Sequence, residues 1–253
     1  MLDSMGKKGL LVNEKIRVYQ ESNAGQQAFA AGMAEGGDGV KVTIIAAGTI
    51  CGRIGPGLTG SPVDRRFLEK MRAATDASLL GAETLRQGDP EMRGPDGCIV
   101  PQRVRGFMTL SGDIPLAGKK IFEHGPRPLI FTGEATASGL RHRVGDLAQI
   151  VSLPAECAGE LSLAAALAHL EKIGVSSVLI EGGGRLNYAC LRQGVVDEIL
   201  LTLTPKLSGD RNAASLCSGP GPLGDPFLSL TLVSCETAET GELFVKYCVN
   251  KGS

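Results

Sequence analysis

From Val40 to the end of the chain, short apolar runs alternate with segments whose apolar residues recur at helical spacing. The runs are short and rich in Val, Ile and Thr, which favours strands over buried helices. We expect strands within residues 41–47, 76–81, 106–112, 127–133, 148–154, 176–180 and 198–205. Because these strands alternate with helical patterns, the sequence predicts an α/β fold.

The first predicted helix covers residues 61–74. Ser61 is a good N-cap, and Asp64 stands in the first turn, where a negative charge is favourable. The apolar face of this helix is expected to contact the core. Its members are Phe67, Met71 and Ala74.

Two more helices and a hairpin are predicted in the second half of the chain. Residues 161–174 form an amphipathic pattern that Ser162 can cap and Gly174 can end. Residues 185–193 follow a run of glycines and have a helical pattern. Residues 228–249 contain two alternating runs around a turn, which predicts an antiparallel hairpin at the edge of the sheet.

The remaining segments divide the chain into an extension and a domain. Residues 1–39 are polar and basic at first and end in a glycine-rich link, so we expect a flexible or peripheral extension in which AFAAGMAEGGDG can hold a short helix. Residues 40–253 are expected to form one domain. Within it, residues 81–106 are rich in loop-forming residues, with GDPEMRGPDG breaking any regular element.

Charge and composition favour a soluble, cytoplasmic protein. The net charge is -1, and Lys and Arg are spread along the chain, so the sequence gives no reason to expect nucleic acid or a membrane surface as a partner. No apolar run approaches the ~20 residues that span a bilayer. The first 15 residues are charged throughout, unlike a signal peptide.

The cysteines and histidines do not predict a metal site. The seven cysteines are scattered and form no CxxC pair, so we interpret them as small, mostly buried thiols in a reducing compartment. The three histidines show no ligand spacing with cysteine or acid. We therefore expect no metal.

The segment SSVLIEGGGRLN is the sharpest local signal in the chain. A strand leads to Glu181, three glycines follow, and a helix begins within a few residues. Consecutive glycines let backbone N–H groups approach an anion, and a helix N-terminus is positive, so a pyrophosphate is the natural ligand. The match to the dinucleotide fingerprint GxGxxG is poor because Asn187 replaces its last glycine. A tight structural turn explains the glycines equally well.

The order of several motifs carries more information than any one of them. KMRAATDASLLGAETLRQGDP is followed by LIEGGGRLN, then GVVDEILLTLTPKLSG. This order resembles the C-terminal reductase domain of the bifunctional riboflavin-biosynthesis protein over residues 41–250. The resemblance implies a dihydrofolate-reductase-like mixed sheet flanked by helices, NADPH as hydride donor and a homodimer. It also implies reduction of the ribosyl group of 5-amino-6-(5-phosphoribosylamino)uracil, or of its non-deaminated analogue, to ribityl.

The resemblance assigns roles to individual residues. Cofactor contacts are implied for Ala47, Thr84, Ser111, Gly183, Gly184, Arg185, Leu186 and Asn187, the last five as the pyrophosphate loop. Glu181 corresponds to a catalytic carboxylate of the substrate pocket, Arg72 to an arginine that binds the anionic substrate, and Met92 to an apolar substrate contact. Purely structural roles are open for three of them: Arg72 as a solvated helix residue, Met92 as a core residue and Ser111 as a turn residue.

Two positions depart from the family pattern. The first loop normally carries an aspartate that faces cofactor and substrate, and Cys51 stands there instead. We therefore expect Cys51 in the catalytic pocket near the nicotinamide, the alternative being an ordinary small buried residue. Gly88 replaces a second aspartate. A thiol with an ordinary pKa of ~8.5 is mostly neutral at pH 7, so Cys51 cannot imitate a carboxylate. The substrate is accordingly less certain than the fold.

Two other functions stay open at this point. The chain can be an NADPH reductase of another pterin, pyrimidine or imine, or a non-catalytic nucleotide-binding relative. NADPH is expected over NADH, because no acid is placed to take a ribose 2′-hydroxyl while Ser111 and Arg103 or Arg105 can meet a 2′-phosphate. The motifs of a zinc deaminase, H-x-E and P-C-x-x-C, are absent from the sequence.

Overall fold

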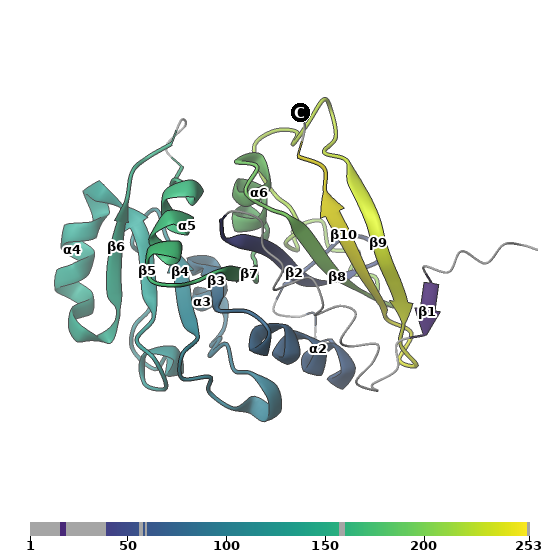
Figure 1. The fold of residues 1–253 in the computed structure, drawn as a ribbon, viewed down its shortest axis with the longest axis horizontal. Coiled ribbons are helices and arrows are strands. Elements are labelled where there is room, and N and C mark those ends of the chain that lie inside the picture. The colour runs from purple at the N-terminus through teal and green to yellow at the C-terminus, as the bar shows by residue number, and fades with distance from the viewer. Residues whose placement is uncertain (1–15, 19–38, 56–57, 59, 157–159, 252–253) are drawn as a thin grey trace, which may run out of the picture.

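The computed structural model describes residues 16–18, 39–55, 58, 60–156 and 160–251 (Figure 1). They form a single ten-stranded sheet in the order β1-β9-β10-β8-β2-β7-β3-β4-β5-β6. The strands are β1 (Ile16–Val18), β2 (Lys41–Thr49), β3 (Ala77–Gly81), β4 (Val104–Met108), β5 (Leu129–Gly133), β6 (Gln149–Leu153), β7 (Ser177–Ile180), β8 (Glu198–Thr204), β9 (Leu230–Thr237) and β10 (Leu243–Val249). The predicted mixed sheet is confirmed.

All strands from β8 to β6 in this order run parallel to one another. Their carboxyl ends therefore lie at one edge of the sheet, where ligands bind in open α/β folds. The predicted C-terminal hairpin is confirmed as the antiparallel pair β9–β10, which joins the sheet through β8.

Helices cover both faces of the sheet (Figure 1). Their bounds are α2 (Pro62–Ala73), α3 (Ala82–Gln87), α4 (Glu134–Val144), α5 (Leu163–Lys172) and α6 (Gly184–Arg192). Buried residues of α5 and α6 share one core cluster, while α2, α3 and α4 bury theirs in two clusters on the opposite face. Among the described residues, no helix has the length and apolar character needed to cross a membrane.

Capping residues were predicted more accurately than helix ends. The Ser61 hydroxyl accepts hydrogen bonds from the N–H groups of Val63 and Asp64, and Ser162 caps α5. Phe67 and Met71 are buried as expected. The prediction for Ala74 is wrong: α2 ends at Ala73, so Ala74 is the C-cap and its side chain is exposed.

Two helices were not predicted. Helix α3 lies in the segment expected to be loop, and it is short and follows β3 without a connecting loop. Helix α4 contains threonine, serine and glycine, which are poor helix formers, and it buries only Ala137, Leu140 and Val144. Packing against the sheet stabilises these helices despite their weak local signals.

The hairpin is not the outermost part of the sheet. Strand β1 pairs in parallel with β9, with Ile16 opposite Cys235. The described part of the extension thus includes a strand that forms the sheet edge, which the sequence did not indicate. The short helix expected in AFAAGMAEGGDG lies outside the described residues.

Candidate functional site

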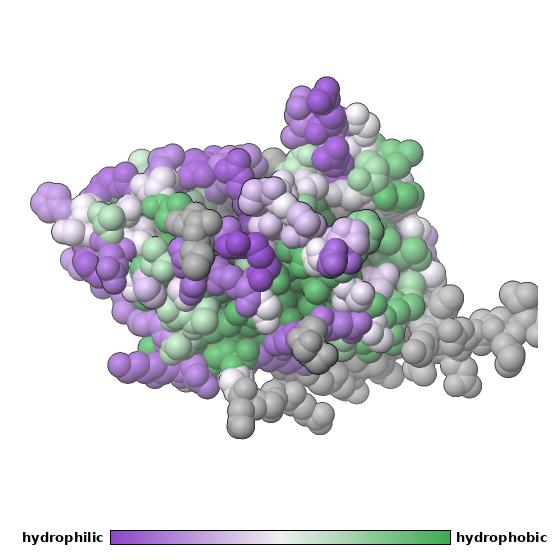
Figure 2. Space-filling view, turned by 90° about the horizontal axis from the view of Figure 1, so that it is seen from above, coloured by the Kyte–Doolittle hydropathy of each residue, from purple (hydrophilic) through white to green (hydrophobic). Residues whose placement is uncertain are grey.

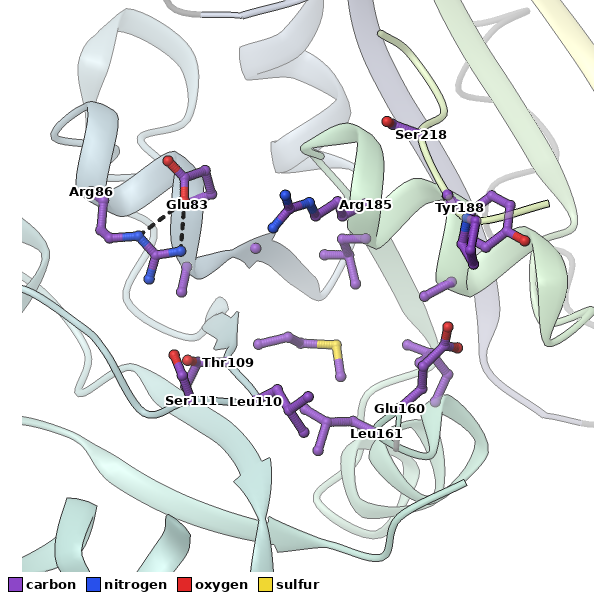
Figure 3. Close-up of a pocket in the computed structure, with 18 residues that line it drawn as sticks. Glu83, Arg86, Thr109, Leu110, Ser111, Glu160, Leu161, Arg185, Tyr188 and Ser218 are labelled. Carbon is purple, nitrogen blue, oxygen red and sulfur yellow. Dashed lines mark hydrogen bonds and ion pairs between the residues drawn. The ribbon is translucent and has the colours of Figure 1, made fainter. Parts of the chain in front are cut away.

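A cavity of about 780 Å³ opens at the carboxyl edge of the parallel strands, between α3 and α6 (Figure 3). Its walls come from the end of β3, the loop after β4, the N-terminal half of α6 and the segment around residue 219. The lining residues are Gly81, Ala82, Glu83, Arg86, Met108, Thr109, Leu110, Ser111, Glu160, Leu161, Leu163, Arg185, Leu186, Tyr188, Ala189, Ser218, Gly219 and Pro220. The volume falls in the range of small-molecule and cofactor sites.

Two neighbouring parallel strands, β3 and β7, direct their helices to this cavity. The Gly81 N–H donates to the Gly182 carbonyl oxygen at 2.8 Å, so the two strand ends lie side by side. Gly182 has φ +94°, a conformation that favours glycine, and its peptide bond to Gly183 is cis. A Cβ built on Gly183 would approach no atom beyond its neighbours in the chain more closely than the Thr84 hydroxyl, at 3.8 Å. The backbone at Gly183 is therefore open to a ligand.

Helix α6 begins at this open backbone without a side-chain cap. The first N–H groups of an α-helix have no intrahelical acceptor, and the helix dipole makes this end positive. An anionic group placed beside Gly183 would meet these donors. Gly183 itself does not line the cavity, so the binding of a pyrophosphate by this loop stays a prediction.

The other members of the predicted loop have different surroundings. Leu186 lines the cavity. Gly184 packs against the backbone of Ser215, since an added Cβ would lie 2.2 Å from its carbonyl oxygen. Asn187 is 1% exposed and donates from Nδ2 to the Leu216 carbonyl oxygen at 2.8 Å. Gly184 and Asn187 therefore fix the 215–218 segment against α6.

Charged and polar groups line the cavity around α6. Arg185 is exposed and makes no hydrogen bond or ion pair to another described residue, and it extends toward the Glu83–Arg86 pair (Figure 3). Ser111 is also on the wall, where its hydroxyl accepts from the Asp113 N–H at 3.2 Å. The predicted cofactor residues Ser111, Arg185 and Leu186 are thus brought together.

Thr84 and Ala47 lie outside the cavity wall. Thr84 stands in the first turn of α3, close to Gly183. Ala47 pairs with Thr202 near the end of β2 and is half-buried.

Glu181 and Arg72 bind each other. Arg72 Nε donates to Glu181 Oε1 at 2.9 Å and Nη2 to Oε2 at 2.5 Å, with both side chains about 6% exposed. Ser78 Oγ also donates to Glu181, and Arg72 Nη1 donates to the Arg93 carbonyl oxygen at 2.9 Å. Burial acts to raise the pKa of Glu181, but the Arg72 charge and these hydrogen bonds outweigh it and hold the pKa below its usual range. Neither side chain lines the cavity.

Three further side chains are buried. Met92 is 2% exposed in the core cluster with Leu80 and Phe107 and has φ +54°, so it packs as a core residue. Arg103 and Arg105 are each 2% exposed, and burial lowers the pKa of both to about 10. Their guanidinium groups donate to backbone carbonyl groups of residues 72–77 and 121–126, respectively. The expectation that one of them meets a 2′-phosphate is wrong.

Cys51 is exposed and lies outside the cavity wall. Its sulfur lies 3.2 Å from the Thr49 hydroxyl and accepts from the Ser208 N–H at 3.4 Å. These hydrogen bonds, that of Thr49 first, lower the pKa of Cys51 to about 7. The alternative of a small buried thiol is wrong, because Cys51 is exposed, and its placement beside the nicotinamide stays a prediction.

Sequence reasoning missed several residues of the cavity. Glu83 and Arg86 lie one turn apart on α3, Glu160 precedes α5, and Tyr188 is on α6. Glu83 and Arg86 are three residues apart, a spacing at which an acid and a base pair on a helix. The sequence was expected to form a loop there, so the pair was not recognised. No group of three His, Cys, Asp or Glu side chains able to hold a metal ion occurs in the described ranges.

The buried pair makes a prediction about stability. Glu181→Gln should lower the free energy of unfolding by about 3 kcal/mol or more, since it leaves the Arg72 charge buried without its partner. Because the folded pKa of Glu181 is depressed, its contribution is present above the unfolded value of about 4.3 and is lost as the pH falls below it. Urea unfolding at pH 7 and pH 4 should therefore show a smaller gap between wild type and variant at pH 4. The exposed Glu171→Gln serves as control; equal effects of the two variants would contradict a buried pair.

The Cys51 thiol makes a second prediction. Its alkylation rate, followed by mass spectrometry of the peptide, should rise with pH around a midpoint near 7, because the thiolate is the reactive form. Thr49→Val removes the strongest hydrogen bond and should move the midpoint upward. A wild-type midpoint near 9, unchanged in the variant, would exclude the hydrogen-bonded thiolate.

Comparison with known proteins identifies the family. The model of the RibD C-terminal domain matches residues 34–244. The 2,5-diamino-6-ribosylamino-4(3H)-pyrimidinone 5′-phosphate reductase of Methanothermobacter thermautotrophicus is 25% identical over 186 residues, covering 71% of this chain and 84% of that protein. The riboflavin biosynthesis protein RibD of Escherichia coli is 38% identical over 64% of this chain and 45% of its own length, so the chain spans less than half of RibD.

Solved structures show the same fold. Acinetobacter baumannii RibD superimposes with a TM-score of 0.69 at 22% identity, covering 84% of this chain and 58% of that one. The family match begins before β2 and ends at the start of β10, so it covers the parallel strands from β2 to β8 and all residues that line the cavity. The chain therefore belongs to the RibD C-terminal domain family, the reductases of riboflavin biosynthesis.

Proposed function

We propose that the chain is an NADPH-dependent reductase that converts the ribosyl group of 5-amino-6-(5-phosphoribosylamino)uracil, or of its non-deaminated 2,5-diamino analogue, to ribityl. The observation that carries this proposal is the cavity at the uncapped N-terminus of α6. The name of the Methanothermobacter relative supports the 2,5-diamino substrate, and that of the E. coli relative places the reaction in riboflavin biosynthesis.

NADPH fits the residues of the cavity. Its pyrophosphate would lie at Gly183 and the first N–H groups of α6, where the backbone is open. Its adenosine would extend toward Leu110 and Ser111, with Arg185 as the cation for the 2′-phosphate. When bound, the cofactor supplies the hydride. The protein's part is to hold the ring against the acceptor carbon and exclude water.

Glu181 acts in this proposal as a positioning residue. A carboxylate whose pKa is depressed by Arg72 and Ser78 stays ionised at neutral pH and cannot deliver a proton. Its place at the end of β7 instead ties α2 and β3 to the strand that carries the glycines. The catalytic role first expected for Glu181 becomes an indirect one.

A reductase of another pyrimidine, pterin or imine is the second candidate. The observation that favours it is the exposed Cys51 where an aspartate is usual, together with Gly88 at the C-cap of α3. At both positions the family carries an acid. The two changes would therefore alter the site of the substrate that accepts the hydride and leave the cofactor cavity intact.

The surroundings of the enzyme can also be proposed. The six free cysteines among the described residues support a reducing, cytoplasmic location.

Exposed apolar residues gather at the β9–β10 end of the molecule (Figure 2). They are Phe227, Leu230, Leu232 and Val233. An apolar surface of this kind supports self-association as a homodimer.

Replacing an exposed apolar residue tests the dimer. Phe227, 84% exposed, should pack in the interface, so Phe227→Asp should shift the sedimentation of the protein from dimer to monomer. Leu147→Asp, at an exposed apolar residue near the other end of the sheet, is the control and should stay dimeric. A monomeric wild type at micromolar concentration would contradict the proposal.

The cofactor site is tested at Gly183. Its φ of -74° suits any residue and the space around it is open, so Gly183→Val should fold. The valine side chain would occupy the place of the pyrophosphate and weaken NADPH binding on the order of 10-fold or more, about 1.4 kcal/mol. Fluorescence titration measures the affinity, with Gly139→Val on α4 as the folded control. Unchanged NADPH affinity in folded Gly183→Val would remove this site.

A further inference from the structure

The guanidinium group of Arg86 is fully engaged within α3 and the loop after β4. Nε and Nη2 donate to Glu83 Oε2 at 3.0 and 2.6 Å, and Nη1 donates to the Asp113 carbonyl oxygen at 2.6 Å. The Asp113 carboxylate lies 3.6 Å from the same Nη1. Although Arg86 lines the cavity, each of its nitrogens already has an acceptor.

Glu83 is the acid that holds Arg86. Its second oxygen accepts from Gln87 Nε2 at 2.8 Å, and its side chain is 53% exposed on the cavity wall. The hydrogen bond from Arg86 lowers the pKa of Glu83, so the carboxylate is ionised at neutral pH. A negative charge thus stands beside the place proposed for the adenosine ribose.

Arg185 is the cation of the cavity wall that no described acid holds by a hydrogen bond or ion pair, and its charge also acts on Glu83. Glu160 is paired with Arg192, and the charges of Glu83 and Arg86 offset each other. Arg185 extends toward this pair from α6 (Figure 3). The attraction of the cavity for a 2′-phosphate consequently rests on Arg185.

We propose that Glu83 is a specificity-determining residue that weakens the preference for NADPH over NADH; this rests on the proposed dinucleotide site. A 2′-phosphate would be repelled by Glu83 and would have to compete with it for Arg86. A ribose 2′-hydroxyl, in contrast, can donate a hydrogen bond to the free face of the same carboxylate. The cavity therefore accepts both dinucleotides, with a modest preference for NADPH supplied by Arg185.

Dissociation constants of NADPH and NADH for wild type and Glu83→Gln test the proposal. Glu83→Gln should tighten NADPH on the order of fivefold and leave NADH equal or weaker, and the gain should shrink at high salt. Glu171→Gln removes the same charge at an exposed glutamate near the C-terminal end of α5, whereas the cavity is lined by Leu163 at the other end of this helix, so it should change neither constant.

Arg86→Met separates a specificity role from an ordinary surface ion pair. In the wild-type background Arg86→Met leaves the Glu83 charge unopposed and should weaken NADPH about fivefold or more, while NADH changes less than about twofold. In the Glu83→Gln background it should weaken NADPH about fivefold or more as well, because it removes the arginine that Glu83→Gln releases. The proposal would be overturned if Glu83→Gln left the ratio of the NADPH and NADH dissociation constants unchanged. A wild type that binds neither dinucleotide would instead overturn the proposed function.

Discussion

The candidate site depends on the pairing of β3 with β7. Strand β3 passes directly into α3 at Gly81, and β7 reaches α6 through Glu181 and two glycines. The hydrogen bond from the Gly81 N–H to the Gly182 carbonyl oxygen sets the distance between the N-terminal ends of α3 and α6. The cavity lies between these two helices, so the pairing of β3 with β7 places the charged side chains of α3 and α6 that line it.

Buried arginines hold the elements around that register. Arg72 joins α2 to the end of β7 through Glu181, and Arg103 donates to the Ala77 carbonyl oxygen and the Ser78 hydroxyl. Arg105 binds the 121–126 segment in the same manner. Burying these cations is costly, and carbonyl and carboxylate acceptors offset the cost. Arg72, Arg103 and Arg105 are thus hydrogen-bonded within the fold, whereas Arg185 and Arg86 line the cavity.

The sequence predicted what is encoded locally. The strand–glycine–helix segment at 176–193 and the Ser61 cap depend on neighbouring residues, and both were predicted. The Arg72–Glu181 pair joins residues 109 positions apart, and no local pattern reveals that the two side chains satisfy each other. The site role of Glu83 needed α3, whose six residues are too few for a clear helical period. The pKa of Cys51 depends on the Ser208 backbone, which only the folded chain brings near.

The central claim is that this cavity serves hydride transfer to the ribosyl group of a phosphorylated aminopyrimidine. The most direct test mixes the protein with NADPH and the 2,5-diamino or 5-amino ribosyl substrate and follows the loss of reduced nicotinamide together with the sugar product. The account predicts one ribityl product for each NADPH oxidised, with the rate strongly reduced in Gly183→Val. A folded protein that binds NADPH but oxidises none of it with either substrate would contradict the account.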